Sequence, residues 1–399
     1  MNKSFLVAML AILALTGSVF AGGEPDGSMR TWIDGEYLFW FLKPAPVSQP
    51  LLTTGSSINP NGSGAGFLGN PGTQVLAGDQ NFNTGHYNGF RINAGWIDCS
   101  DTIGVEGSFI YLSPHSTGVK FASDASGNPL IARPVIDART GNETTLLVAA
   151  PNAFSGSANI SSTTSLFGFD ANAIWPVCRG CCDDEIIRYF YFLTGFRYLN
   201  LRDDLTIGQS TTVLPAGISF FNGLPVLSPG QIGVTDGIGT LNQFYGGQLG
   251  VQGGLTWWRF TLNGTAKLAI GSMREEASVN GTTSVNFLAQ NQTTSGGLLS
   301  ASSNGGSHTR NILAVVPEGA LSFNLEITPQ IKLMLGYTIL YASNVARPGE
   351  QIDRSVNRTT VPTSEAFNPS IGGPQRPAFN WNGTDFWAQG VNIGIGLRF

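Results

Sequence analysis

The sequence predicts an all-β protein that forms an antiparallel up-and-down transmembrane β-barrel of about ten strands, in a range of about 10 to 14, with long outer loops. Three observations predict this fold: the composition, a two-residue hydrophobic period, and the spacing of the segments that show the period. Charged residues make up 12% of the 399 residues and glycine contributes 52, whereas about a quarter of an average soluble chain is charged. This composition excludes a coiled coil and a charge-rich disordered chain.

The N-terminal segment has the features of an export signal. Lys3 precedes an apolar stretch over residues 5–15, and Val19 and Ala21 are small residues at the positions that a signal peptidase requires. We therefore predict a signal peptide over residues 1–21, a mature barrel over residues 22–399, and export to the cell outer membrane. An N-terminal membrane anchor is the alternative, which the short apolar run disfavours, since spanning takes about 20 residues.

Apolar and polar side chains alternate in segments of the kind that form strands with two unlike faces. The clearest segment is 258–270, where Leu262, Leu268 and Ile270 share one face while Arg259 and Lys267 share the other. Nine similar segments cover residues 32–42, 87–98, 102–112, 165–175, 186–201, 243–255, 311–327, 331–342 and 385–399.

The connections between these segments alternate between long and short. The long ones cover residues 43–86, 113–164, 202–242, 271–310 and 343–384, and the short ones lie at 98–101, 176–185, 253–256 and 328–329. In an up-and-down barrel with both termini on one side, every long connection lies on the opposite side, which is the layout of bacterial outer-membrane barrels. A soluble β-sandwich is the alternative, but it gives no reason for so regular a rhythm.

The last segment is the most specific one. Val391, Ile393, Ile395, Leu397 and Phe399 lie on one face of an alternating strand, and Phe399 ends the sequence. We expect Phe399 to act as an assembly signal, so that the expected partners are the barrel assembly machinery and outer-membrane lipids. Aromatic residues near strand ends, among them Trp40 and Trp175, are expected at the membrane interface.

Charged residues on the polar faces of the strands are expected to point into the lumen. The candidates are Glu36, Arg91, Glu106, Arg197, Arg259, Lys267 and Glu318, together with Asp34, Asp170 and Glu326. They carry both signs, so they could pair with one another or line a narrow water path. Barrels of about eight strands are filled by side chains and open channels need about 16 or more, so we expect a narrow or plugged pore.

One long connection is a candidate plug. It covers residues 343–384 and carries, shortly after the segment 331–342, a tight turn formed by Arg347, Pro348 and Gly349. Proline fixes its own φ and glycine permits a reversal of the chain, so this loop could bend back over the mouth. We hypothesise that Arg347 pairs with a lumen acid, with Glu318 the nearest candidate in the sequence. A solvated loop arginine is the alternative.

Four cysteines fall in two short turns, Cys99 in one and Cys178, Cys181 and Cys182 in the next. In an oxidising compartment an even number of cysteines favours disulfides, and four cysteines permit three connectivities. We expect Cys99 to pair with one of the other three, because that bond would join adjacent hairpins. A four-cysteine zinc site is the alternative, which the vicinal Cys181 and Cys182 disfavour.

The sequence offers little support for catalysis. His86, His115 and His308 lie near outer strand ends, which leaves an outer-membrane hydrolase open, but no catalytic or phosphate-binding motif accompanies them. We therefore expect no enzymatic activity and no cofactor. Nucleic acid is not an expected partner either, because the net charge is −5 and no long basic run occurs. The sequence makes no prediction about the oligomeric state.

A long stretch, residues 336–353 (GYTILYASNVARPGEQID), resembles the C-terminal signature of the planctomycete outer-membrane β-barrel proteins, the beta barrel porin family seven. Shorter matches support the resemblance at residues 32–40, 195–199 and 242–248. The resemblance implies an outer-membrane barrel and brings no catalytic residues. Together with the residue pattern, it predicts a porin-like or structural surface protein, with a narrow or plugged pore for small hydrophilic solutes. A loop-mediated adhesion or binding module is the alternative function.

Overall fold

In a computed structural model, the described residues are 29–55, 65–82, 85–98, 102–179 and 187–399. Nearly all of their regular structure is extended, because alternating patterns dominate the sequence, and their helical segments are short 3-10 turns. Within these ranges, no helix has the length and apolar character that crossing a membrane requires. The predicted signal peptide over residues 1–21 lies outside the described residues.

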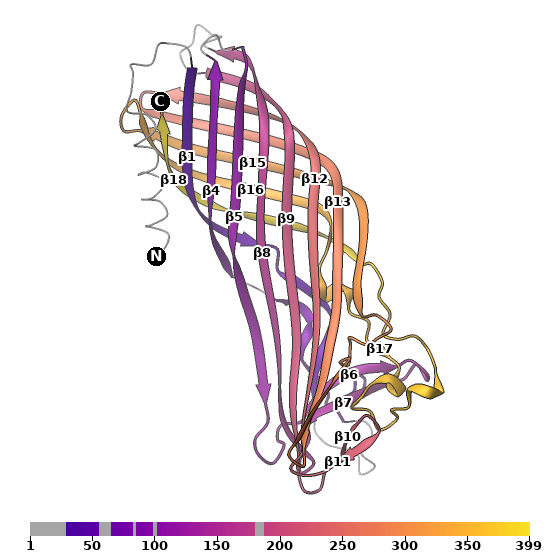
Figure 1. Cartoon of the computed structure of the whole chain (residues 1–399). Coiled ribbons are helices and arrows are strands. Elements are labelled where there is room, and N and C mark those ends of the chain that lie inside the picture. Colours follow the sequence, from indigo (N-terminus) through magenta and orange to yellow (C-terminus); the bar gives the residue numbers. More distant parts are fainter. Residues whose placement is uncertain (1–28, 56–64, 83–84, 99–101, 180–186) are drawn as a thin grey trace.

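Ten long strands form a closed ring, in which each strand pairs antiparallel with both neighbours (Figure 1). In ring order they are β1 (Met29–Leu42), β4 (His86–Asp98), β5 (Gly104–Ala122), β8 (Phe154–Arg179), β9 (Ile187–Val213), β12 (Gln231–Trp257), β13 (Phe260–Phe287), β15 (Gly306–Glu326), β16 (Ile331–Ala346) and β18 (Gly383–Arg398). The ring closes where Trp32 of β1 pairs with Arg398 of β18. The predicted up-and-down barrel is therefore confirmed.

The connections alternate as the sequence predicts, with the short turns and the end of the chain on one side and the long connections on the other (Figure 1). We call these the terminal side and the long-loop side. The long connections contain β2 (Ala45–Thr54), β3 (Gln74–Phe82), β6 (Ile131–Asp137), β7 (Glu143–Ala149), β10 (Ser219–Phe221), β11 (Leu224–Val226), β14 (Gln290–Ser295), η1 (Pro348–Gln351), β17 (Ser355–Val356), η2 (Arg358–Thr360) and η3 (Pro369–Ile371).

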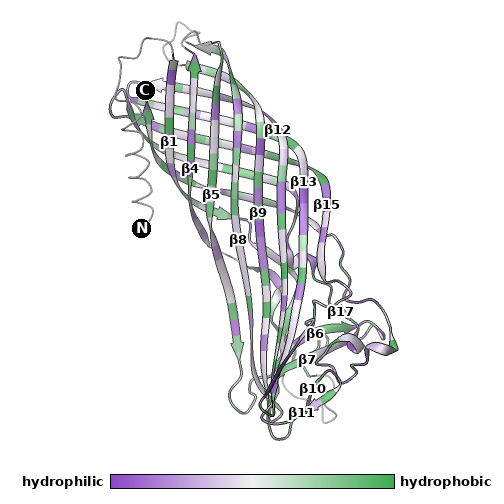
Figure 2. Cartoon of the chain, in the orientation of Figure 1, coloured by the Kyte–Doolittle hydropathy of each residue, from purple (hydrophilic) through white to green (hydrophobic). Residues whose placement is uncertain are grey.

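An apolar belt covers the outside of the ring toward the terminal side. On β13, Leu268 and Ile270 are 45% and 52% exposed, whereas Thr261 is 5% exposed. On β18, Ile393 is exposed while Asn392 is buried. Figure 2 shows the same interleaving of hydrophobic and hydrophilic residues along the other strands of the ring. Because large apolar side chains on alternate residues around a closed ring are stable against lipid, this belt is the membrane-facing surface.

Several strands continue far beyond the belt, which corrects the predicted extent of the long loops. β12 and β13 contain 27 and 28 residues, and their distal parts occupy stretches that the sequence assigned to loops. Outward side chains there are polar, such as Arg202 on β9 and Arg274 on β13. The prediction was wrong because a strand face exposed to water carries Gly, Ser, Thr and Asn, which are also typical of loops.

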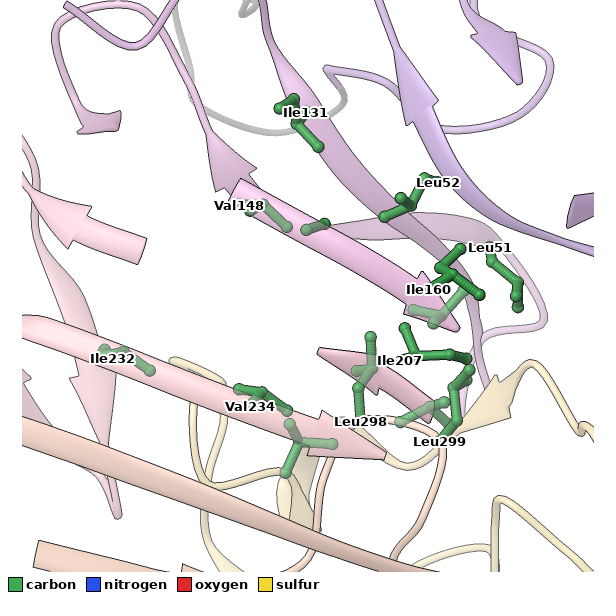
Figure 3. Packing of buried hydrophobic residues seen from close by; sticks show 14 of the residues in the cluster. Leu51, Leu52, Ile131, Val148, Ile160, Ile207, Ile232, Val234, Leu298 and Leu299 are labelled. Carbon is green, nitrogen blue, oxygen red and sulfur yellow. The ribbon is translucent and has the colours of Figure 1, made fainter. Parts of the chain in front are cut away.

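A second hydrophobic core stabilises these distal strands. Inward side chains of the distal strands, such as Ile160 and Ile232, pack against Leu52 of β2, Ile131 of β6 and Val148 of β7 (Figure 3). β6 pairs with β2, β7 and β17, and β2 pairs with β3, so that a five-stranded sheet covers the inner face of the extended strands. The long connections are therefore packed structure rather than free loops.

The turn between β12 and β13 lies later than the sequence predicted. Trp257 pairs with Phe260, so the turn consists of Trp258 and Arg259 and not of residues 253–256. Trp257 and Trp258 are both highly exposed, at 81% and 74%. Because these two aromatic residues are adjacent, the alternating pattern of the strand can be counted from either of them, and the sequence alone does not show where the turn lies. As a consequence Arg259 is not a lumen residue, since it is exposed at the turn with its guanidinium over the Trp258 ring.

We expect that Leu321→Arg destabilises the folded barrel by about 2–4 kcal/mol, because it places a cation on the lipid face near the middle of the belt. Leu321 is 62% exposed and lies beside Gly264 and Tyr337. Asn311→Arg is the matched control, since Asn311 is exposed on the same strand beyond the belt. Unfolding of both variants by urea in lipid vesicles measures the difference, and equal destabilisation would contradict the position of the belt.

Candidate functional site

The interior of the barrel is divided into layers along its axis. On β1, the inward residues change from Asp34 and Glu36 near the terminal side to Leu38 and Trp40 toward the long-loop side. β9 follows the same order, since Arg197 precedes the buried Leu199 and Leu201. The charged layer consists of Asp34, Glu36, Arg91, Glu106, Asp170, Arg197, Lys267, Glu318 and Lys332.

Two arginines connect the acids at the centre of the charged layer. Arg197 Nη2 lies 3.0 Å from Asp170 Oδ2 and 2.5 Å from Glu318 Oε2. Arg91 Nη2 lies 3.6 Å from Glu318 Oε1, and Arg91 Nη1 lies 4.0 Å from Glu36 Oε2. The Arg91 guanidinium also lies 5.5 Å from the centre of the Trp40 ring. Glu318 is therefore held between two guanidinium groups in the middle of the lumen.

Two lysines complete the charged layer. Lys267 Nζ lies 3.3 Å from Glu106 Oε1 and 3.2 Å from Asp170 Oδ1. Lys332 Nζ lies 2.9 Å from Asp34 Oδ1. Each acid of the layer thus faces at least one base, which compensates for the cost of holding charges away from bulk water.

Of the ten lumen candidates that the sequence indicates, Glu326 lies outside the charged layer and pairs with Arg398 at 2.8 Å. The structure brings together eight others, namely Asp34, Glu36, Arg91, Glu106, Asp170, Arg197, Lys267 and Glu318. Arg259 lies apart from them at the turn described above. Sequence reasoning missed Lys332, although the alternation of Ile331 and Leu333 outward with Lys332 inward could have identified it. Trp40 also departs from expectation, because it is fully buried in the lumen and not at the membrane interface.

An apolar layer closes the barrel on the long-loop side of the charged layer. Each ring strand contributes at least one buried side chain to this layer, further toward the long-loop side than its charged or polar inward residue. The layer consists of Leu38, Trp40, Leu42, Tyr87, Leu112, Leu166, Leu199, Leu201, Phe244, Ala269, Met273, Ala314, Val316, Leu340, Ala342, Val345, Phe386 and Ala388. Glycines make room for the largest rings. A Cβ on Gly246 would lie 2.4 Å from the Phe244 ring, and one on Gly390 would lie 2.7 Å from the Trp40 ring.

The loop after β16 folds inward above the apolar layer. Arg347 is 1% exposed, and its Nε lies 2.9 Å from Asp203 Oδ2, while its guanidinium lies 5.6 Å from the centre of the Phe386 ring. Asn242 Nδ2 donates to the Ala346 carbonyl at 2.9 Å and Asn242 Oδ1 accepts from the Ala346 amide at 2.7 Å. Arg347 therefore pairs with an acid inside the ring, but that acid is Asp203 and not Glu318, because Arg91 and Arg197 already engage Glu318.

A cavity of about 580 Å³ occupies the lumen on the terminal side of the charged layer. The exposed Pro329 and Gln330 of the β15–β16 turn contribute to its lining, so it reaches the end of the barrel. A void of about 20 Å³ lies further in, beside Trp40 and Arg197, and such a void has room for about one water molecule. As far as the described residues go, the lumen is thus open on the terminal side and sealed toward the long-loop side.

Two further candidates concern the terminal side. The Phe399 amide donates to the Thr31 carbonyl at 3.0 Å, and the Thr31 amide donates to the Phe399 carbonyl at 3.3 Å, so the last residue continues the β1–β18 pairing. Cys99, Cys181 and Cys182 lie outside the described residues, and so does the side chain of Cys178. The predicted disulfide is therefore untested.

The histidines do not form a common site in the part of the chain that the structure describes. His86 stacks on Phe39 at 4.6 Å, His115 contacts Tyr87 edge-on at 5.3 Å, and His308 stacks on Phe379 at 3.9 Å between ring centres. No group of three or more metal-ligating side chains occurs among those residues either.

A comparison with models of protein families gives a match over most of the chain. Residues 32–399 match the model of a family whose description is "Putative beta barrel porin-7 (BBP7)". No curated protein matches the chain.

Several solved structures share a weak likeness to the chain. The attachment invasion locus protein Ail of Yersinia pestis has 8% identity and a TM-score of 0.20, with 93% of this chain and 98% of that one covered. The translocator domain of the autotransporter NalP from Neisseria meningitidis has 8% identity and a TM-score of 0.22, with 98% and 95% covered. A Pseudomonas aeruginosa FadL homologue has 7% identity and a TM-score of 0.22, with 93% and 90% covered.

Proposed function

The chain belongs to the beta barrel porin-7 family, and from this we propose that it is a plugged member of that family. It is a porin-like surface protein of the outer membrane whose barrel anchors the packed structure on the long-loop side. The observation that carries the proposal is the apolar layer, in which Trp40, Phe244 and Phe386 are fully buried across the lumen. Ions do not cross such a layer without a change of conformation, because their desolvation is too costly.

Conductance in planar lipid bilayers tests the proposal. We expect that the unmodified protein gives no stable open steps. Phe244→Ala should give measurable ion flow, because it removes a large ring from the apolar layer beside Leu199, and Leu199 lines the small void. Phe196→Ala is the matched control, since Phe196 faces lipid on the neighbouring strand β9 and is 41% exposed. Stable steps of conductance from the unmodified protein would overturn the plugged state. A folded Phe244→Ala variant that remains closed would show that the apolar layer is not what seals the lumen.

A binding or adhesion role for the long-loop side is the second candidate, and one observation favours it. Ile218, Leu224 and Leu227, at and beside the β10–β11 hairpin, are 56%, 70% and 48% exposed, and clustered apolar side chains at such a position often contact partners. Replacement of the three residues by serine tests this role. Folded barrels should then lose attachment of cells to surfaces, whereas unchanged attachment would count against it.

We further infer that the chain is exported by a signal peptide over residues 1–21 and that Phe399 engages the barrel assembly machinery. The pairing of Phe399 with Thr31 supports the second inference, because a chain without Phe399 would lose part of the contact that closes the ring. We infer no enzymatic role, because the chain belongs to a barrel family described as porin-like, and this inference rests on the family alone.

A further inference from the structure

The cavity on the terminal side has features that the plugged barrel does not require. A plug needs only side chains that fill the lumen, yet about 580 Å³ is left empty between the charged layer and the end of the barrel. Binding sites for small molecules usually measure about 300–1,000 Å³ and combine apolar walls with a few polar groups. The two walls of this cavity differ in that way.

One wall is apolar and aromatic. Trp32, Ile97, Ile174, Tyr189 and Tyr191 all line the cavity. Trp32 and Tyr191 pack against a cluster formed by Ile97, Ile174 and Leu193, and the rings of Tyr189 and Tyr191 stack with 4.7 Å between their centres. Gly95 leaves room for the indole, since a Cβ there would lie 2.4 Å from the Trp32 ring. These contacts hold the aromatic rings in place at the side of the cavity.

The other wall consists of uncharged polar side chains from β12, β13 and β15. Thr256, Thr261, Asn263 and Asn324 line it. Asn324 is 1% exposed, and neither its Nδ2 nor its Oδ1 has a hydrogen-bond partner among the described residues. A buried amide without partners costs free energy, so Asn324 is poised to receive a ligand that both donates and accepts a hydrogen bond.

The charges at the floor of the cavity favour a neutral ligand. Four acids of the charged layer line the cavity, namely Asp34, Glu36, Glu106 and Glu318. Each of them already has a basic partner: Lys332 for Asp34, Arg91 for Glu36, Lys267 for Glu106 and Arg197 for Glu318. A cation or an anion would have to displace one of these partners. A neutral ligand can fill the cavity and leave the charged layer intact.

We propose that this cavity binds one saccharide unit, either a free sugar or the end of a glycan. Two neighbouring hydroxyl groups can accept from the Asn324 amide nitrogen and donate to its oxygen, while the apolar face of the sugar ring lies against Trp32 or Tyr191. This function goes beyond the plugged barrel and does not depend on it, because the ligand enters and leaves on the terminal side. A conducting barrel and a barrel that binds sugar are separately measurable.

Isothermal titration calorimetry of the folded full-length chain tests the proposal, because it measures the heat of sugar binding. The protein is held in lauryldimethylamine oxide, a detergent without a sugar head group, and D-glucose, D-galactose and N-acetyl-D-glucosamine are titrated at millimolar concentrations. We expect saturable binding of at least one sugar and no binding of glycine betaine, a small zwitterion. If no sugar binds, or if glycine betaine binds as well as the best sugar, the proposal is wrong.

Variants locate the site. Asn324→Leu keeps the size of the side chain and should weaken binding by about tenfold, since it removes two uncharged hydrogen bonds. Asn311→Leu, on the outward face of the same strand, should leave binding unchanged. Thr261→Val provides a second isosteric change in the same wall, should Asn324→Leu fail to fold. Thr261 pairs with Asn324 in the β13–β15 register and its hydroxyl lies 3.0 Å from that of Thr256, so the change should weaken binding by several-fold. Unchanged binding in a folded Asn324→Leu or Thr261→Val variant would overturn the assignment of the site.

Discussion

Arg347→Ala is expected to destabilise the protein by about 3–5 kcal/mol, because it leaves the carboxylate of Asp203 buried without its partner. Both side chains are buried, at 1% and 0% exposed. Asp203 retains only the hydrogen bond from Thr164, which cannot balance a full charge. Urea unfolding of the barrel in lipid vesicles measures the loss, and proteolysis of the loop after β16 reports whether the inward fold is lost first.

The adjacent surface pair provides the control for Arg347. Arg202 and Asp204 flank Asp203 on β9 and form an exposed ion pair, with 62% and 43% of their side chains exposed. Arg202→Ala should therefore cost only about 0–1 kcal/mol, since surface ion pairs contribute little. If the two arginine variants lose the same stability, the burial of Arg347 does not decide its contribution. If Arg347→Ala also raises ion conductance, the inward loop takes part in sealing the lumen.

Asp236→Ala is expected to cost about 3–5 kcal/mol in the second core, since it leaves the buried Arg133 without a counter-ion. Arg133 Nη2 lies 2.6 Å from Asp236 Oδ2, and the two side chains are 1% and 0% exposed. The other oxygen of Asp236 accepts from the Leu299 amide at 2.8 Å and from the Ser300 amide at 2.9 Å. The loss therefore also releases the turn around residues 298–301, which hydrogen exchange at these amides would detect.

Two further variants separate the charge from the packing. Glu276→Ala removes a partly exposed acid from the same region, paired with Arg274 at 3.7 Å, and should have an effect of about 0–1 kcal/mol. The double change Arg133→Met with Asp236→Leu should be milder than Asp236→Ala, because replacing both members of a buried pair leaves no unpaired charge. A double variant as unstable as Asp236→Ala would show that shape, rather than charge, decides the stability of this contact.

The sequence by itself determined the ring strands and the direction of their faces. The two-residue period is a local property, so Leu268 and Ile270 outward and Lys267 inward could be assigned without knowledge of any neighbour. The long and short connections likewise follow from the order of segments along the chain. The last strand was predictable in the same way, since the alternation from Val391 to Leu397 continues up to Phe399.

The sequence predicted secondary structure less well where the same amino-acid composition is typical of both a strand and a loop. The distal parts of β12 and β13 carry Gly, Ser, Thr and Asn on their outward faces, and this composition also suits loops. Their strand character depends on Ile232, Val234 and Val279 being buried by segments far away in the sequence. Only the packing of β2, β6 and β7 against them distinguishes the two possibilities.

Only the tertiary structure decided which charges meet and whether the lumen is open. The partner of Arg347 is Asp203, which lies 144 residues away, because the register of ten strands and the path of one loop place them together. The two-residue period can place the side chains of Trp40, Phe244 and Phe386 on the inward faces of their strands. It does not show that the three side chains lie at the same level along the barrel axis. That coincidence results from the stagger of the strands around the ring, and it turns side chains from different strands into one apolar layer.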